Sequence, residues 1–489
     1  MPEFYRITLE KKVIRFCLFF VLLGVSACQL TPKTESAPST PTPASSTLTP
    51  GKSQPIPGGP VLLYKGISLR KVLDIGPGKI RVVLNPADGN VYVLNPGDGI
   101  YKINNLADNT TKDQIASSQQ DIGGSPTGMA FAQDGTLYVV YNEVVNDNTN
   151  RVVIRKGVPD GNGKFTWGTL AASEPYPLSN TYFDHLYNGI VVSLDGQYVY
   201  VNGGSRTDHG EVETNSGAFP GAREVALTSK ILRIPTSAND LVLPNDEAAL
   251  DAQKLIFSRG TRNAYDMAFA PNGDLFAIDN GPDADYPDEL NWIQAGAHYG
   301  FPWRFGTQDN PQRLADYDPT KTKDVHLQSG FFAVDNGFYQ NDPKFPQPPS
   351  GTFTDPVTNL GPAAMKYRGD DGKEHDAGKE GKTLSTFTPH RSPLGLVFAT
   401  EAKLPAPWRG SDAQFNAFLV SYGAAGGTLS DQGQDLLFLQ LVKKGDHYES
   451  TTLQVATGFK NPIDAVLIEN KLYILEYSGT AVIWELTFQ

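Results

Sequence analysis

The sequence predicts an all-β fold, specifically a six-bladed β-propeller of four-stranded antiparallel blades. Two observations favour it: a β-rich unit recurs six times along the chain, and helical periodicity is scarce. Each unit has an apolar stretch, a turn with Asp-Gly or a near equivalent, and a strand of alternating apolar residues. One such sheet cannot bury both faces alone, so the sheets are expected to stack in a ring. A β-sandwich would also supply short strands, but it would not explain a turn signature that recurs.

The six units differ mainly in their turns. Four turns carry Asp-Gly or Asn-Gly, the fifth unit is looser, and the sixth has Glu-Asn; we expect two-residue hairpin connections at these turns. The units begin at Val82, Gly128, Gly189, Met267, Leu394 and Ala465. The last strand, Ala481 to Leu486, is expected to close the ring by pairing with the segment from Val61 to Tyr64.

The first 59 residues indicate export. Basic residues precede an apolar run from Phe16 to Val25, and this pattern is typical of a secretory signal. The run is too short to span a bilayer. It ends in Val25-Ser26-Ala27-Cys28, which resembles a bacterial lipobox. We therefore expect a lipoprotein signal peptide at residues 1–27, lipidation of Cys28, and a Pro/Ser/Thr-rich tether over residues 28–59.

This reading predicts a protein that is exported and lipid-anchored to the bacterial cell envelope, on its periplasmic or cell-surface face. The chain's only other cysteine, Cys17, lies inside the apolar run, so no disulfide is expected after cleavage. The alternative is an ordinary secretory signal with a stray cysteine.

The charge balance restricts the partners. The net charge is −12, and it becomes −14 without residues 1–27, which carry four Lys or Arg and two Glu. An acidic surface repels nucleic acid and anionic lipid headgroups, so neither is an expected partner, and the membrane is contacted only through the lipid anchor. Neutral small molecules remain possible ligands. The propeller is expected over residues 60–489.

A long insertion, about residues 301–391, separates the fourth and fifth units. It is dense in Asp, Gly, Pro and Lys and poor in strand pattern. Insertions of this length in a compact domain are either binding loops and lids or surface loops without a fixed structure. The sequence leaves both readings open.

Several motifs resemble one known family, the soluble quinoprotein glucose dehydrogenases and their sorbosone dehydrogenase-like relatives. The motifs run in order from the start of the fourth unit: Gly260-Thr261-Arg262-Asn263, Asp279-Asn280-Gly281-Pro282, Asp288-Glu289-Leu290-Asn291 and Gly296-Ala297-His298-Tyr299-Gly300. The resemblance implies a six-bladed propeller that binds pyrroloquinoline quinone (PQQ) and Ca²⁺ on its axis. It also implies oxidation of a sugar hydroxyl or hemiacetal by hydride transfer to the quinone.

The resemblance assigns roles to two catalytic residues and two cofactor ligands. His185 resembles the general base that takes the hydroxyl proton, and an imidazole suits this because its pKa lies near neutrality. Asp184 would orient the site. Arg262 and Asn263 resemble the pair that contacts the quinone oxygens. The plainer alternatives are a hydrogen-bonded structural histidine and an arginine that closes a salt bridge between blades.

The resemblance also assigns a calcium site. Gly281 and Pro282 match backbone carbonyl ligands, and Asp288 is the nearest match to an acid beside them. Tyr286 and Pro287 are extra residues that displace this acid from the family spacing. The alternative is a tight Gly-Pro turn.

The sequence departs from the family where the three carboxylates of PQQ need cations. The family has a lysine and two arginines at these places, which here are about Ala424, Asn461 and Ile463. Arg391 and Lys460 lie near these places in the sequence and are the candidate substitutes for the family's cations. The polar segment of residues 206–211 either rebuilds the pocket for another ligand or forms an exposed loop, and the sequence favours the loop slightly.

Three functions follow. The first is a PQQ-dependent sugar dehydrogenase with a sugar substrate and an unknown electron acceptor. The second is a non-catalytic surface propeller that binds a glycan or an envelope protein. The third is a calcium-dependent lactonase-like hydrolase, because Asn142, Asn202 and Asn280 end comparable strands and could surround an axial metal.

Overall fold

The computed structural model describes residues 48–51, 56–314, 316–318, 324–411, 413–423 and 427–489 of the 489-residue chain. The predicted signal peptide, the lipidation site Cys28, most of the tether and Ala424 lie outside the described residues. None of the described helices is long and apolar enough to cross a membrane.

The first three sheets come from the first half of the described chain. The first contains β3 (Arg81–Leu84), β4 (Val91–Asn95), β5 (Gly99–Asn104) and β6 (Thr111–Ser117). The second contains β7 (Pro126–Phe131), β8 (Leu137–Val145), β9 (Thr149–Pro159) and β10 (Phe165–Ser173), joined by β11 (Tyr176–Pro177) and β15 (Leu241–Leu243). The third contains β12 (Tyr187–Val192), β13 (Tyr198–Gly203), β14 (Lys230–Pro235) and β16 (Ile256–Arg259).

The remaining sheets follow the same plan. The fourth contains β17 (Ala264–Phe269), β18 (Leu275–Asp279) and β19 (Glu289–Ile293). The fifth contains β26 (Pro393–Phe398), β27 (Phe415–Ser421), β28 (Asp435–Lys444) and β29 (His447–Thr457), joined by β1 (Val61–Leu62), β22 (Thr358–Pro362) and β25 (Leu384–Ser385). The sixth contains β30 (Pro462–Ile468), β31 (Lys471–Glu476), β32 (Val482–Phe488) and β2 (Ile67–Asp74).

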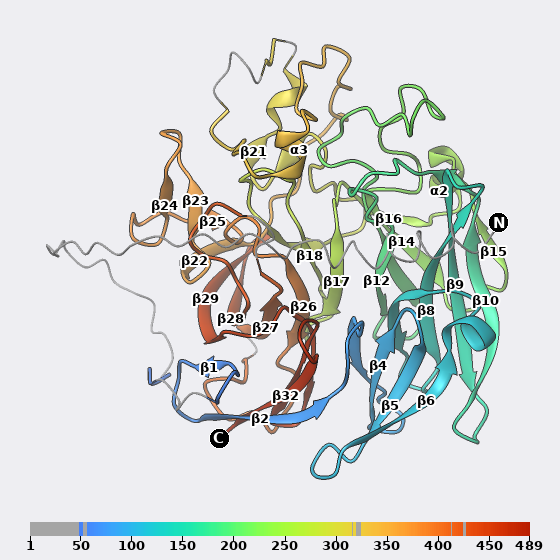
Figure 1. Ribbon diagram of the computed structural model, residues 1–489, viewed down its shortest axis with the longest axis vertical. Coiled ribbons are helices and arrows are strands. Elements are labelled where there is room, and N and C mark those ends of the chain that lie inside the picture. Colours follow the sequence, from blue (N-terminus) through green and yellow to red (C-terminus); the bar gives the residue numbers. More distant parts are fainter. Residues whose placement is uncertain (1–47, 52–55, 315, 319–323, 412, 424–426) are drawn as a thin grey trace, which may run out of the picture.

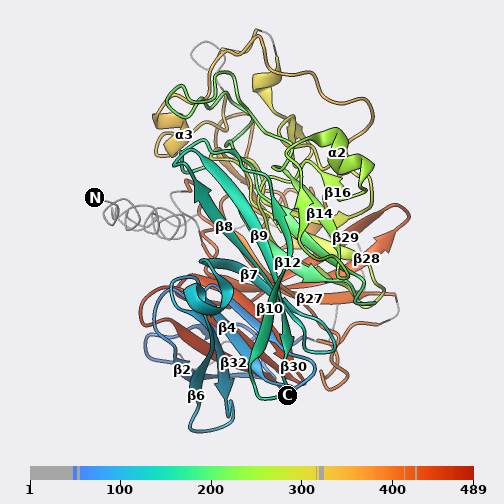
Figure 2. The ribbon, with the colours of Figure 1, turned by 90° about the vertical axis from the view of Figure 1, so that its right-hand side faces the viewer.

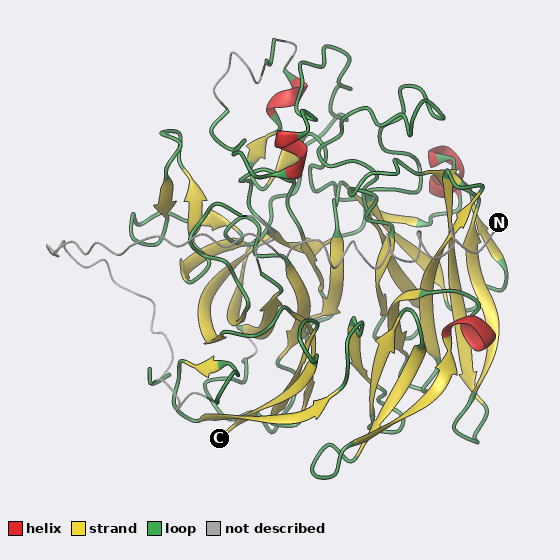
Figure 3. Ribbon diagram, viewed as in Figure 1, coloured by secondary structure: helices red, strands yellow, loops and turns green. Residues whose placement is uncertain are grey.

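These sheets form an all-β propeller, as predicted (Figure 1). The first strand of each sheet contacts the first strand of the next, in the closed series β3, β7, β12, β17, β26, β30 and again β3. Within the described residues, five sheets have the four or more strands expected of a blade, and the β17–β18–β19 sheet has three. Figure 3 shows how little helix there is: η1 (Ser118–Ile122), α2 (Glu247–Ala252), η2 (Pro311–Arg313) and α3 (Phe332–Asp335) are all short.

The last sheet is built from both ends of the described chain. β2 pairs antiparallel with β32, from Ile67 opposite Phe488 to Asp74 opposite Val482. The predicted closure by Val61 to Tyr64 is therefore wrong, because β1 pairs instead with β29 in the fifth sheet. The eight residues of β2 make a longer hydrogen-bonded ladder with β32 than the two residues of β1 could make.

The turns are longer than predicted in most units. Leu84 pairs with Val91 across the first turn, so six residues connect the strands, whereas Glu469-Asn470 in the sixth unit forms the predicted two-residue link. The reason lies in the aspartate side chain. Asp88 accepts a hydrogen bond from the amide of Asn90 at 2.9 Å, and Gly89, at the centre of this Asx-type turn, has a positive φ.

The hydrophobic core lies between neighbouring sheets. All five residues of β4 are buried, because both faces of a blade are covered by its neighbours. The insertion follows β19 and lies beyond one end of the ring, where α3 is drawn in yellow (Figures 1 and 2). Besides β22 and β25 it contains the hairpins β20 (Arg304–Phe305) with β21 (Gln308–Asp309) and β23 (Lys366–Arg368) with β24 (Glu374–Asp376).

The inner strands approach so closely that some positions tolerate only glycine. A Cβ atom on Gly128 in β7 would lie 2.0 Å from the carbonyl oxygen of Asn188 in β12. We expect Gly128→Ala to lower the free energy of unfolding by at least about 1–3 kcal/mol, because the two backbones must separate. Denaturant unfolding measures this.

The matched control is Gly168→Ala in β10, where a Cβ would meet nothing within 4 Å. Equal stability of the two variants would contradict the close approach of β7 and β12.

Candidate active site at the end of the ring

His185 lies two residues before the inner strand β12, and Ser205 is one of the neighbours that hold its ring. Its Nδ1 lies 2.9 Å from the hydroxyl oxygen of Ser205, whose own proton is donated to the carbonyl of Thr207 at 2.8 Å. Since this hydroxyl has already donated its proton, Nδ1 must be the donor to it. The basic lone pair of His185 is therefore on Nε2.

The surroundings of His185 favour a neutral imidazole. Burial lowers the pKa of His185 well below its usual 6.5, and the positive charge of Arg262 adds to this, while Asp208 acts in the opposite direction. An unprotonated ring at neutral pH is what a proton acceptor requires.

Asp184 does not orient His185 in this structure. Its carboxylate accepts hydrogen bonds from the backbone amides of Ser179 at 2.9 Å and Asn180 at 2.8 Å. Burial raises the pKa of Asp184 to about 6. The orienting role predicted for Asp184 is instead filled by Ser205, which the sequence analysis did not single out for this.

Arg262 is engaged in an ion pair between loops of neighbouring sheets. Its Nη2 lies 2.7 Å from Oδ1 of Asp208, its Nε donates to the carbonyl of Asp208 at 2.7 Å, and its Nη1 donates to the carbonyl of Asn280 at 3.3 Å. Asp208 is 0% exposed. This is the structural alternative considered for Arg262, a salt bridge between blades.

Asn263 belongs to a chain of side-chain amides that crosses three sheets. Its Oδ1 accepts from Asn188 at 2.9 Å, and its Nδ2 donates to Asn280 at 3.1 Å. Asn280 in turn donates to the carbonyl of Pro393 at 3.1 Å. These uncharged donors and acceptors come from the same end of the ring as His185.

The segment of residues 206–211 is buried, so the exposed loop favoured by the sequence is wrong. The reason is a set of partners far away in the sequence. Asp208 receives hydrogen bonds from the ring of His209 at 2.8 Å, the hydroxyl of Tyr339 at 3.2 Å and the amide of Asp283 at 2.9 Å, besides Arg262. Burial alone would raise the pKa of Asp208, but Arg262 and His209 hold it below its usual value.

The insertion covers this end of the ring. Tyr339 stacks on His209 with ring centroids 3.7 Å apart and planes at 9°. The amide of Ala333 in α3 donates to Asp283 at 2.7 Å, and Arg223 pairs with Asp342 at 2.6 Å. The described part of the insertion is therefore packed on the propeller, which agrees with a binding loop or lid and not with a surface loop without a fixed structure.

The predicted calcium ligands are arranged as a backbone turn. The carboxylate of Asp288 accepts from the amide of Gly281 at 2.8 Å and from that of Ser392 at 3.0 Å, so both of its oxygens face N–H groups. The carbonyl of Pro282 accepts from Ala284 at 2.8 Å. In the described part of the chain, no three His, Cys, Asp or Glu side chains are grouped to hold a metal. The carbonyls of Gly281 and Pro282 stay a prediction.

All three asparagines expected around an axial metal make contacts within the protein, and those of Asn280 are given above. Asn142 accepts from Asn150 at 3.0 Å and donates to the carbonyl of Tyr187 at 2.8 Å. Asn202 donates to Asn188 at 3.2 Å. These bonds join neighbouring strands, so they give no support to a lactonase-like metal centre.

The two substitute cations are not placed as a carboxylate clamp. Arg391 is 1% exposed and is paired with Asp431 and with Asp435, whose oxygen lies 2.5 Å from its Nη2. This corrects the prediction for Arg391, because both carboxylates belong to the fifth repeat itself. Lys460 is exposed, and its backbone amide donates to Glu476 at 2.7 Å.

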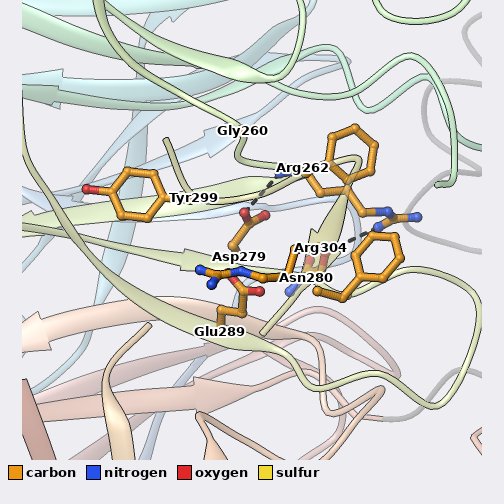
Figure 4. A pocket seen from close by; sticks show the side chains of 10 residues that line it. Gly260, Arg262, Asp279, Asn280, Glu289, Tyr299 and Arg304 are labelled. Atoms are coloured by element: carbon orange, nitrogen blue, oxygen red, sulfur yellow. Dashed lines mark hydrogen bonds between the residues drawn. The ribbon is translucent and has the colours of Figure 1, made fainter. Parts of the chain in front are cut away.

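A very small cavity lies beside Arg262, with a volume of about 10 Å³ (Figure 4). Asp279, Glu289 and Arg304 are among its lining residues. Burial raises the pKa of Asp279 to about 6 and that of Glu289 to about 8. Since pockets for small molecules usually have about 300–1,000 Å³, this cavity is too small for a sugar or a quinone in the described arrangement.

The residues described at this end do not fit PQQ as the family resemblance implies. Three carboxylates need cations, but Arg262 and Arg391 already have carboxylate partners, and the cavity beside Arg262 adds two buried acids. The amide chain and the neutral imidazole are suited to an uncharged ligand instead.

The pairing of Arg391 can be tested by comparing the two predicted clamp residues. We expect Arg391→Met to lower the free energy of unfolding by about 3–5 kcal/mol, because it leaves the buried carboxylate of Asp435 without its cation. The same substitution at the exposed Lys460 is expected to change it by less than about 0.5 kcal/mol. Thermal and denaturant unfolding measure both, and a stable Arg391→Met protein would contradict the ion pair.

Comparison with known proteins agrees with this fold. The curated quinoprotein glucose dehydrogenase B of Acinetobacter calcoaceticus is 32% identical over 98 residues, a match that spans only 20% of this chain and 20% of that protein. The apo soluble aldose sugar dehydrogenase of Escherichia coli matches with a TM-score of 0.52 and 16% identity, over 86% of this chain and 100% of the other.

The holo PQQ domain of the Coprinopsis cinerea pyranose dehydrogenase also has a TM-score of 0.52, with 13% identity over 91% of this chain and 98% of that domain. At such low identity, these structures establish the propeller fold alone. The family model described as Glucose / Sorbosone dehydrogenase matches residues 78–328, which is more than half of the chain. The chain therefore belongs to the glucose/sorbosone dehydrogenase family.

Proposed function

We propose that the protein oxidises a sugar at a hydroxyl or hemiacetal, as a sugar dehydrogenase of its family. The observation that carries this proposal is His185, whose ring is held by Ser205 with the lone pair on Nε2 and whose pKa lies well below 6.5. It is a neutral base at the end of the ring that the insertion covers.

The residues of this chain account for the proton half of such a reaction. The Nε2 atom of His185 would accept the hydroxyl proton as the carbon–hydrogen bond breaks. The amides of Asn263 and Asn280 would hydrogen-bond an uncharged sugar without demanding a counter-ion. PQQ, the cofactor implied by the family resemblance, would supply the hydride acceptor when bound, but the paired arginines argue against it in this arrangement.

The first test is reconstitution. The full-length protein is expected to reduce a redox dye when given aldoses, and parallel samples with PQQ and Ca²⁺, with chelator, or with neither show whether the quinone is needed. Turnover together with a bound-quinone absorbance would support the PQQ-dependent form of the proposal. Turnover without bound quinone would indicate another oxidant, and no turnover with any sugar and acceptor would refute the dehydrogenase.

The second test is the pH dependence of the base. We expect His185→Gln to lower kcat by about 10²–10⁴-fold. Because the pKa of His185 is lowered, the ring stays neutral as the pH falls, so kcat/KM should hold its value from pH 8 down to about 6.5 and fall only below the usual histidine pKa.

The control for this variant is His375→Gln on the β23–β24 hairpin, where the ring pairs with Asp371 and Glu380 at the surface. It should change neither kcat nor the pH profile. An acid limb at or above pH 6.5 in the unmodified protein would exclude His185 as the base.

A second candidate function is a non-catalytic propeller that binds a glycan or an envelope protein. The paired state of Arg262 beneath the insertion favours it, because this pairing leaves an anionic cofactor without its expected partner. A glycan array combined with the dye assay distinguishes the two functions: ligand binding without turnover supports this one.

Two structural proposals complete the assignment. The three-stranded β17–β18–β19 sheet, the fourth along the chain, is also a blade and brings the number of blades to six, supported by the contacts of β17 with β12 and β26.

The chain is exported and anchored through a lipid on Cys28, supported by the sequence of residues 1–28. Metabolic labelling with palmitate, compared between the protein and Cys28→Ala, tests the anchor.

A further inference from the structure

We propose that a surface pocket between the first and second sheets binds a neutral saccharide. The pocket, called here the β6–β10 pocket, is lined by β6, the one-turn helix η1 and the start of β10. Its volume is about 250 Å³, slightly below the roughly 300–1,000 Å³ of typical small-molecule sites. Its lining residues include Gln114, Ser117, Gln120, Lys164, Phe165 and Trp167. None of these belongs to the site at the end of the ring.

One wall of the β6–β10 pocket is aromatic and rigid. Phe165 and Trp167 are two residues apart on β10 and so face the same side, with ring centroids 5.7 Å apart. A Cβ atom on Gly157, opposite Trp167 in β9, would lie 2.9 Å from the indole. The indole therefore lies against the neighbouring backbone and is held there without a ligand. A fixed, half-exposed indole offers an apolar surface to the C–H face of a sugar ring at little entropic cost.

The opposite wall is polar but carries almost no net charge. Gln114 donates to the carbonyl of Asp98 at 2.9 Å, which fixes its amide, and Gln120 is exposed. The carboxylate of Asp121 accepts from the backbone amide of Ser117 at 2.7 Å and from its hydroxyl at 2.9 Å. With Lys164 as the one cation, the lining is balanced. Amide and hydroxyl groups beside aromatic rings match the hydroxyls and C–H groups of an uncharged sugar, and a phosphate or other anion has no cluster of cations to bind.

Packing between the sheets does not by itself account for this wall. An aromatic row crosses from the first sheet to the second, with centroid distances of 4.8 Å from Tyr92 to Phe131 and 6.4 Å from Phe131 to Phe165. Phe165 and Trp167 both pack in part against this core, with ring centroids 5.7 Å apart, and Trp167 keeps a part of its indole exposed at the pocket. A peptide strand added to the edge of β6 is the other occupant to consider. The exposed charges of Lys112 and Asp113 on that edge disfavour such pairing.

Calorimetric titration of the full-length protein with maltotetraose, cellotetraose and chitotetraose tests the proposal, with tryptophan fluorescence as a second readout. We expect saturable binding of at least one of them. Trp167→Ala should weaken it by about tenfold or more, and Gln120→Ala should weaken it to a smaller extent without affecting the packing. The matched control is Gln197→Ala, an exposed glutamine in the third turn, which should leave the affinity unchanged.

The outcomes separate this pocket from the proposed active site. Weaker binding in both Trp167→Ala and Gln120→Ala, with unchanged thermal stability, supports the proposal, whether or not the protein oxidises sugars. The proposal is overturned by the absence of binding at millimolar saccharide. It is also overturned by binding that both variants retain, which would assign the sugar to the end of the ring, or by a competing extended peptide that binds instead.

Discussion

The buried carboxylate of Asp208 is the constraint on which the arrangement of the site depends. A charge removed from water must be matched by donors, and Asp208 is matched by Arg262, the ring of His209, the hydroxyl of Tyr339 and the amide of Asp283. These donors come from three regions that are distant in the sequence. Satisfying one carboxylate therefore joins the third sheet, the fourth sheet and the insertion into a single closed end of the ring.

That closure also determines what the site can bind. The guanidinium that the family resemblance assigns to a quinone is directed at Asp208, and its positive charge contributes to the neutral state of His185. The same Arg262 thus helps to keep the base unprotonated while having no uncompensated charge to offer an anion. An anionic ligand would have to displace Asp208 or move the insertion, and either change would leave a buried carboxylate short of donors.

The sequence was sufficient for the features that depend on local pattern. Alternating apolar residues indicated where the two inner strands of each unit lie. Because the third unit begins just after His185, the sequence also indicated that His185 precedes β12. Features that depend on distant partners were missed. Residues 206–211 were predicted as an exposed loop because they are polar, yet Arg262 and Tyr339 bury them from 54 and 131 positions away. The turn lengths were wrong because aspartate side chains bond the turn amides, which a dipeptide signature does not reveal.

The charges of the molecule suit an uncharged sugar better than an anionic cofactor. A sugar is uncharged, and both the amide chain around Asn263 and the β6–β10 pocket present hydrogen-bonding groups without net charge. A quinone with three carboxylates is strongly charged, and the described arginines near its expected place, Arg262 and Arg391, are already neutralised by aspartates. This arrangement therefore suits an uncharged ligand such as the proposed sugar, whereas an anionic oxidant could be bound only if the ion pair between Asp208 and Arg262 opened. Whatever accepts the hydride must either be weakly charged or bring enough binding energy to open that pair.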